Sequence, residues 1–260
     1  MYLSHFSLTH FPFERTLHSD ELFASSAARE AQARLHHLVE LRGIGLVTGE
    51  VGSGKTTACR QLAAVLHPGL YRVFYVPLST GNVMDMYKAI AWQLGLPIER
   101  NRAIHSEVCR LATECHVHPV LVVDEAQHLR NDVLEDLRLL TNYDMDSQPR
   151  LCLLLVGLSE LRRRLAMSVH ESLAQRVVVR LHLGGLTRDE LSAYVEHRLR
   201  LAGTSLPLFE PAALQALFQD TQGLPRKVNR LAHYALSAAA LARAKQITAE
   251  HVQCAEEELQ

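Results

Sequence analysis

The chain has 260 residues, of which 48% are hydrophobic and 21% are charged, and its formal net charge is −1. This composition predicts a folded protein of one large or two modest domains, and it excludes binding to nucleic acid through a generally basic character. The sequence contains no recognisable signal peptide and no run of about 18 apolar residues, so we expect a cytoplasmic protein without membrane contact.

Residues 1–24 form an arm that is rich in phenylalanine, including Phe6, Phe11 and Phe13. Such an arm is too apolar to be disordered, and we expect it to pack on its own domain or on a neighbouring subunit. A helix is predicted over 25–42, where Ser25 or Ser26 can cap it, and a short buried strand follows at 45–48.

A glycine-rich loop follows this strand and fits the pattern G-x-x-x-x-G-K-[ST]. Its backbone N–H groups, together with the start of the next helix, can surround an anion. We expect the lysine to contact the β- and γ-phosphates of ATP, the threonine after it to bind Mg²⁺, and the second threonine to lie near the α-phosphate. The nucleotide-binding candidates are Gly49, Glu50, Val51, Gly52, Ser53, Gly54, Lys55, Thr56 and Thr57.

A second motif comes at the end of an apolar strand over 119–125, where Asp124 and Glu125 are adjacent. Ligands of parallel sheets bind at the carboxyl ends of the strands. A carboxylate there can hold Mg²⁺ directly or through water, so we expect Asp124 to be a second metal-site residue beside Thr56. Glu125 is placed to orient and deprotonate the attacking water. The alternative, two solvated acids that cap a turn, is weakened by the loop upstream.

Further strands are expected at 71–78, 150–156 and 177–183, with helices between them. Nearly continuous apolar strands that alternate with helices predict a three-layer α/β domain with a parallel sheet. After Gly184 the strands stop, and a capping box at Thr187 opens the first of four helices. We therefore divide the chain into the arm 1–24, an α/β core 25–184 and a helical domain 185–260.

These motifs, in this order, resemble those of the AAA+ ATPases and most closely the ExeA-type branch. The resemblance includes the opening of the arm and the loop Gly49–Thr57. It continues through Asp124–Leu129, Leu137–Asn142, Leu173–Arg176 and Gly223–Arg226. It implies a P-loop AAA+ core with a small all-α lid that uses ATP and Mg²⁺.

The resemblance also assigns roles to two arginines, which on composition alone could be ordinary surface residues. Arg176 is similar to the arginine finger, which acts on ATP bound to the adjacent subunit, and Arg226 is similar to the lid arginine that senses the γ-phosphate. A homo-oligomer is therefore implied, either a ring or a helical filament. The chain departs from the family at Leu158, where members carry a polar residue that senses the attacking water. Ser159 is a candidate for that role.

Members of this branch fall into two functional groups. One comprises ATPases of type II secretion, in which a transmembrane helix and a wall-binding domain follow the ATPase. The other comprises transposition helper ATPases similar to TnsC, TniB, MuB and IstB. Because no further domain follows in this sequence, we interpret it as a regulator of transposition that assembles with ATP on double-stranded DNA without sequence specificity. It would select target DNA and recruit or activate a transposase, with a target-selector protein as a further partner.

Three basic clusters could line a DNA groove and contact backbone phosphates, although solvated arginines explain each of them as well. They are Arg162–Arg164, the set of Arg226, Lys227 and Arg230, and the pair of Arg100 and Arg102. The alternatives to the transposition interpretation are the ATPase of an export apparatus and a nucleotide-gated scaffold with little turnover.

Overall fold

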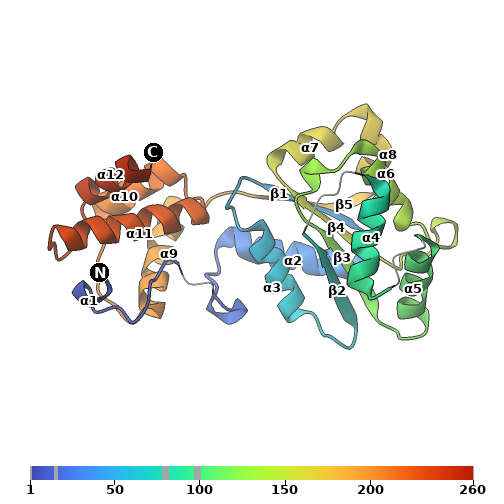
Figure 1. The fold of residues 1–260 in the computed structure, drawn as a ribbon, viewed down its shortest axis with the longest axis horizontal. Coiled ribbons are helices and arrows are strands. Elements are labelled where there is room, and N and C mark those ends of the chain that lie inside the picture. The colour runs from blue at the N-terminus through green and yellow to red at the C-terminus, as the bar shows by residue number, and fades with distance from the viewer. Residues whose placement is uncertain (1, 15–16, 78–81, 97–100, 260) are drawn as a thin grey trace. The chain divides into compact units, whose positions relative to one another are not determined.

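A computed structural model of the chain describes residues 2–14, 17–77, 82–96 and 101–259. The chain divides into two compact units (Figure 1). The core unit consists of Ala28–Glu50 and Lys55–Leu183. The helical unit consists of Met1–Ala27, Val51–Gly54 and Gly184–Gln260. Four residues of the glycine-rich loop therefore group with the helical unit.

The core unit is built on a five-stranded sheet in the order β2-β3-β4-β1-β5. Its strands are β1 (Ile44–Gly49), β2 (Tyr71–Val76), β3 (His118–Val123), β4 (Cys152–Gly157) and β5 (Val177–Leu183). Every pairing is parallel, as the apolar strands predict. The central strands β1 and β4 are buried along their whole length, whereas the edge strand β5 alternates buried and exposed residues. The parallel arrangement brings the carboxyl ends of β1, β3 and β4 to one edge, where the site residues lie.

Helices cover both faces of this sheet. One face packs in an apolar cluster with α4 (Val83–Leu94), α5 (Asn101–Thr113) and α6 (Asn131–Leu140). The opposite face is covered by α2 (Ser26–Leu41), which approaches β1 so closely that a Cβ on Gly45 would lie 2.2 Å from Leu38 Cδ2. The helix after the loop, α3 (Lys55–Val65), is joined to α2 by a hydrogen bond from Gln32 to the carbonyl of Ala58. The α/β fold class predicted from the strand pattern is thus confirmed.

The segment between β4 and β5 contains two short helices that the sequence pattern does not reveal. They are α7 (Ser159–Leu165) and α8 (Glu171–Arg176). A smaller difference concerns one element end: β4 begins at Cys152 instead of 150. The last residue of the strand expected over 71–78 lies outside the described residues.

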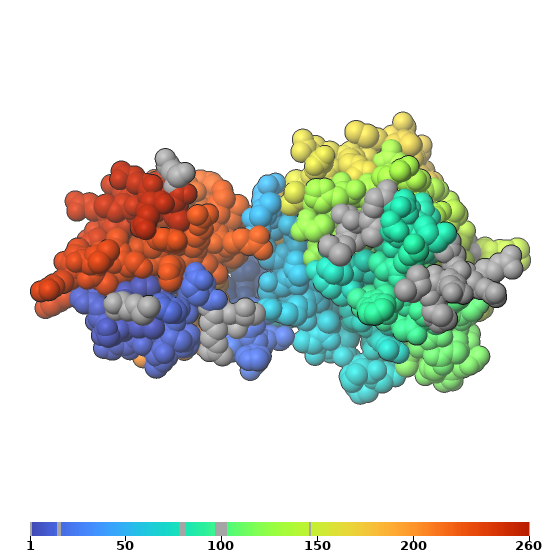
Figure 2. All heavy atoms as spheres, in the orientation of Figure 1, coloured from blue at the N-terminus to red at the C-terminus, as the bar shows by residue number. Residues whose placement is uncertain are grey.

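The helical unit contains α9 (Arg188–Leu201), α10 (Pro211–Thr221), α11 (Pro225–Leu241) and α12 (Ala249–Leu259). Thr187 caps α9 in the expected capping box with Glu190. The arm packs on these helices and begins with the short α1 (Tyr2–His5). Tyr2 bonds to His233 at 2.9 Å, and the buried Arg198 donates to the carbonyl of Pro12 at 2.6 Å. Figure 2 shows the first residues, in blue, against the last helices, in red. Within the described ranges, no helix is long and apolar enough to cross a membrane.

Candidate nucleotide site

At two of its three glycines, the loop between β1 and α3 has the backbone conformation that a phosphate loop requires. Gly52 and Gly54 adopt φ values of 80° and 97°, in the left-handed region that glycine tolerates best. Gly49, the first glycine of the motif, instead ends β1 and is not among the residues of positive φ. Gly52 has a second reason to lack a side chain, because a Cβ there would lie 2.4 Å from Cβ of Arg226.

Lys55, the first residue of α3, is buried with its charge at the base of the loop. Its Nζ donates hydrogen bonds to the carbonyl oxygens of Gly49 at 3.0 Å and Glu50 at 2.9 Å. Only 7% of the residue is exposed. A cation in this position holds the loop in a compact form and presents positive charge where an anion would bind.

Two further observations fit an anion at this loop. The hydroxyl of Ser53 is buried and has no hydrogen-bond partner among the described residues. A buried polar atom without a partner is uncommon, and it often indicates a missing ligand or water. The space where Gly54 would carry a Cβ is open to at least 4 Å. Thr57, the last residue of the motif, is half-buried in the first turn of α3.

Asp124 and Thr56 lie close together, as expected for two residues of one metal site. The Thr56 hydroxyl donates to Asp124 Oδ2 at 2.9 Å, and Asp124 is only 4% exposed, whereas Thr56 is exposed. Oxygen ligands of these two types suit Mg²⁺. The residues present therefore fit a metal–nucleotide complex.

Tyr75, which the sequence did not identify, completes the surroundings of Asp124. Its hydroxyl donates to the same Oδ2 atom at 2.8 Å. Burial, together with the hydrogen bond to Asp124 and the nearby negative charge, raises the pKa of Tyr75, so the hydroxyl remains a proton donor. The signal that could have found it is its place near the carboxyl end of β2, which pairs with β3.

Glu125 leaves the end of β3 in an unusual backbone conformation, with φ 53° and ψ 33°. Its own N–H donates to Asp124 Oδ1 at 2.9 Å, which holds the turn against the strand end. The Glu125 side chain is exposed, and its Oε2 accepts a hydrogen bond of 2.6 Å from Nε2 of Gln127. An acidic group is thereby presented beside Asp124, where a water could approach it.

The two arginines assigned by resemblance lie in different units. In the core unit, Arg176 ends α8, is half-buried and donates to Asn142 Oδ1 at 3.2 Å. In the helical unit, Arg226 is exposed in the first turn of α11, and its N–H donates to the carbonyl of Gly52 at 3.3 Å. The start of α11 therefore contacts the tip of the glycine-rich loop.

The sensor candidate Ser159 contacts the loop directly. Its hydroxyl donates to Glu50 Oε1 at 2.6 Å. Leu158 instead uses its backbone, whose N–H donates to Gln127 Oε1 at 3.1 Å. Gln127 therefore contacts the backbone just after the end of β4.

The basic clusters proposed for DNA are not equivalent in the structure. Arg162 and Arg163 are exposed on α7, but Arg164 faces inward and donates to the carbonyls of Gln127 and Leu129 and to Asn131. Including Arg164 in a DNA-binding cluster is therefore wrong, because its guanidinium is occupied by these acceptors of the core unit.

Of the other two basic clusters, the structure describes the side chains of only one. The set of Arg226, Lys227 and Arg230 is exposed on α11. Arg100 and the side chain of Arg102 lie outside the described residues.

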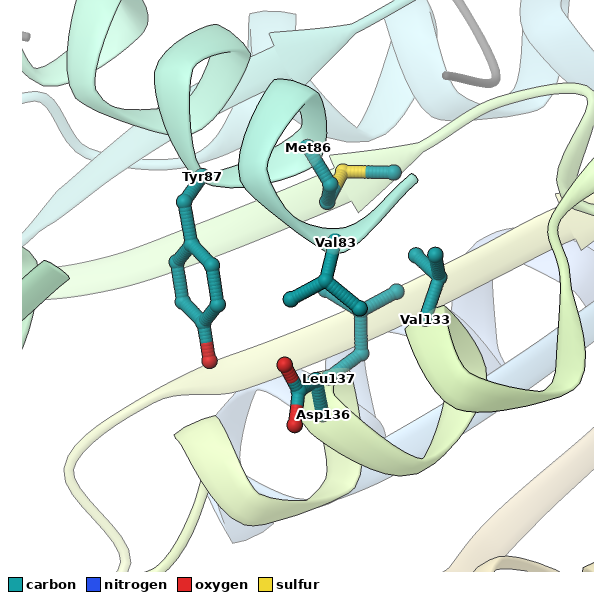
Figure 3. A pocket seen from close by; sticks show the side chains of 6 residues that line it. All are labelled: Val83, Met86, Tyr87, Val133, Asp136 and Leu137. Carbon is teal, nitrogen blue, oxygen red and sulfur yellow. The ribbon is translucent and has the colours of Figure 1, made fainter. Parts of the chain in front are cut away.

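A small hollow in the core unit is separate from this site. It lies between α4 and α6 (Figure 3), where Tyr87 and Asp136 extend toward each other beside apolar side chains. Burial, with the charges of Asp132 and Glu135, raises the pKa of Asp136. No residue of the glycine-rich loop lines the hollow.

Comparison with known proteins agrees with this geometry. A family model described as an AAA domain matches residues 37–165. The general secretion pathway protein A of Aeromonas hydrophila is 36% identical over 246 residues, which are 92% of this chain and 45% of that protein. The chain thus spans slightly less than half the length of this curated relative.

Solved structures share the fold at lower identity. The structure of Cdc6p from Pyrobaculum aerophilum matches with a TM-score of 0.71 and 18% identity, covering 95% of this chain and 70% of that one. A structure of Drosophila ORC bound to DNA matches with a TM-score of 0.68 and 21% identity, covering 99% of this chain and 65% of that one. The chain belongs to the AAA+ family of ATPases and is a relative of general secretion pathway protein A.

Proposed function

We propose that the chain binds ATP with Mg²⁺ and hydrolyses it to ADP and phosphate. The observation that carries this proposal is the hydrogen bond between Thr56 and Asp124, because it joins the two motifs that one metal–nucleotide complex needs. The family membership supports nucleotide use by this fold.

Each residue has a role that follows from its place. The backbone of Gly52–Gly54 and the ammonium of Lys55 would hold the phosphates, while Thr56 and Asp124 would hold Mg²⁺. When bound, the metal neutralises charge on the transferred phosphoryl group. Glu125 would orient the attacking water and accept its proton, and most of the rate gain would come from placement and electrostatics.

Arg226 and Arg176 are proposed to complete the site by resemblance. The contact of Arg226 with Gly52 supports a role at the loop, and its exposed guanidinium can turn toward a γ-phosphate. Arg176 would act on ATP of an adjacent copy in a homo-oligomer. In that case it must exchange its present bond with Asn142 for one to phosphate.

For the biological role, we propose an ATPase of an export assembly system. The identity of 36% to general secretion pathway protein A favours this alternative over the transposition interpretation that we drew from the sequence. The comparisons do not support a transposase partner. Since the matched segment is 45% of that relative, the role of the whole relative extends to this chain only as a proposal.

A chimaera tests the export role. The matching segment of the Aeromonas hydrophila protein would be replaced by this chain, and protein secretion into the medium would be measured in a strain that lacks the native protein. We expect secretion to be restored, and a chimaera with Lys55→Ala to accumulate equally but fail to restore it.

The transposition interpretation makes a different prediction for the purified chain. A gel shift with non-specific duplex DNA, with and without ATP, would detect assembly on DNA, and a steep salt dependence would indicate phosphate contacts. ATP-dependent DNA binding at low salt, together with an inactive but well-expressed chimaera, would overturn the export role and leave the ATPase proposal intact.

A further inference from the structure

Gln127 lies between Glu125 and the end of β4 and contacts both. Its Nε2 donates to Glu125 Oε2 at 2.6 Å, and its Oε1 accepts from the N–H of Leu158 at 3.1 Å. The residue is 5% exposed, although it follows Glu125 by only two positions. A buried amide with both ends occupied has little freedom to move.

The two partners also fix which end of the amide is which. A backbone N–H can only donate, so the atom that faces Leu158 must be the oxygen. An ionised carboxylate can only accept, so the atom that faces Glu125 must be the nitrogen. The orientation that donates to Glu125 is therefore the one that satisfies both neighbours.

The surroundings of Gln127 are shaped to hold it there. A Cβ on Gly157 would lie 2.7 Å from Gln127 Oε1, so glycine at the end of β4 leaves room for the amide. On the other side, Arg164 of α7 donates to the backbone carbonyls of Gln127 and Leu129. Strand β4 and helix α7 thus fix both the side chain and the turn that carries it.

Glu125, in contrast, is exposed, and an exposed glutamate has many accessible rotamers. A general base contributes only when its carboxylate is within reach of the proton that it accepts. A buried donor that selects one orientation of this carboxylate therefore removes part of the entropic barrier to reaction.

We propose that Gln127 is a positioning residue that holds the Glu125 carboxylate in its working orientation and links it to the end of β4. This inference rests on the proposed ATPase function. The backbone N–H of Leu158 and the Gln127 amide together supply a polar connection from the end of β4 to Glu125, although the Leu158 side chain is apolar.

The test is the ATP turnover of five purified variants of this chain with Mg²⁺, compared with the wild type. Gln127→Ala removes both contacts. Gln127→Glu keeps an acceptor for Leu158 but replaces the donor that faces Glu125 by a second carboxylate. Glu125→Gln and the double variant Glu125→Gln/Gln127→Ala show whether Gln127 acts through Glu125. Gln253→Ala, at an exposed position on α12, is the matched control.

We expect kcat of Gln127→Ala and Gln127→Glu to fall by roughly 10- to 100-fold, with KM for ATP unchanged. Gln127→Glu should also unfold at a lower midpoint, because it buries a second carboxylate beside Glu125, so turnover is compared well below that midpoint. In the Glu125→Gln background, Gln127→Ala should cause no further loss. Gln253→Ala should match the wild type.

Two outcomes separate this inference from the function on which it rests. If the wild type turns over ATP and Gln127→Glu keeps full kcat, the positioning role alone is overturned. The same follows if Gln127→Ala causes an equal loss of kcat in the wild-type and the Glu125→Gln backgrounds. A wild-type chain without Mg²⁺-dependent turnover overturns the proposed function, and the positioning role with it.

Discussion

The Thr56 hydroxyl donates a hydrogen bond of 2.9 Å to Oδ2 of Asp124, a residue 68 positions further along the chain. The two residues follow β1 and β3, which are separated in the sheet by β4. Parallel strands that end at one edge bring such distant positions together without any local sequence signal. This bond therefore connects the phosphate loop with the acidic strand end.

Tyr75→Phe tests how far the surroundings of Asp124 control metal binding. The change keeps the ring but removes the hydroxyl that donates to Asp124. Residues that hydrogen-bond to a metal ligand typically affect metal affinity by 10- to 100-fold, so we expect the Mg²⁺ concentration for half-maximal turnover to rise roughly 10-fold. ATP binding without metal should not change. An unaltered Mg²⁺ dependence would show that the bonds from Thr56 and from the Glu125 N–H are enough to orient Asp124.

Arg164→Gln should destabilise the core unit, because the guanidinium satisfies the Gln127 and Leu129 carbonyls and Asn131. Loss of these bonds should cost about 2–3 kcal/mol in the free energy of unfolding, measured with denaturant. Arg163→Gln, one position earlier and exposed, is the matched control and should change stability by less than about 0.5 kcal/mol. Equal effects of the two changes would contradict the inward role of Arg164.

Protonation of His170 should make the stability of the core unit depend on pH. This histidine is buried and bonds to Asn131, and burial together with the nearby Arg164 charge lowers its pKa despite the opposing influence of Glu135. The unfolded chain therefore takes up the proton first as pH falls below about 6.5, which favours unfolding.

The measurement is the free energy of unfolding at pH 7.5 and pH 5.5. Stability should decrease on acidification in the wild type and decrease less in His170→Gln, which can still donate to Asn131. The same change in the free energy of unfolding in both proteins would exclude His170 as a source of the pH dependence.

Arg198→Gln tests the packing of the N-terminal arm. The buried guanidinium donates to the carbonyl of Pro12 at 2.6 Å. Its loss should weaken the attachment of the arm by about 2 kcal/mol and make residues 1–24 more sensitive to limited proteolysis. Arg200→Gln, exposed on the same helix, is the control. An arm that is equally resistant in both variants would mean that its other contacts hold it without the bond from Arg198.

Local patterns were sufficient to predict the fold and the two motifs. The apolar strands, the loop Gly49–Thr57 and the pair Asp124–Glu125 each carry their signal within a few residues. The roles of Glu125, Arg176 and Arg226 remain proposals, since geometry places these residues without testing them.

What the sequence did not reveal depends on contacts between distant segments. Tyr75 has no distinctive spacing, and Gln127 lies in the matched segment Asp124–Leu129 without a role of its own. The contacts of both residues appear only when β2 and β4 are placed beside β3. Arg164 was grouped with Arg162 and Arg163 because composition cannot show which of three consecutive arginines faces inward. The short helices α7 and α8 escaped prediction because a helix of six or seven residues has too few turns to show a clear period.

The most direct test of the account is the rate of phosphate release from ATP by the wild type and by Glu125→Gln, with ATP binding measured in parallel. We predict Mg²⁺-dependent turnover in the wild type and a loss of roughly 100-fold or more in Glu125→Gln, with ATP still bound. Equal turnover in the two proteins would contradict the assignment of Glu125. ATP binding without turnover in the wild type would contradict the ATPase proposal and favour a nucleotide-gated scaffold.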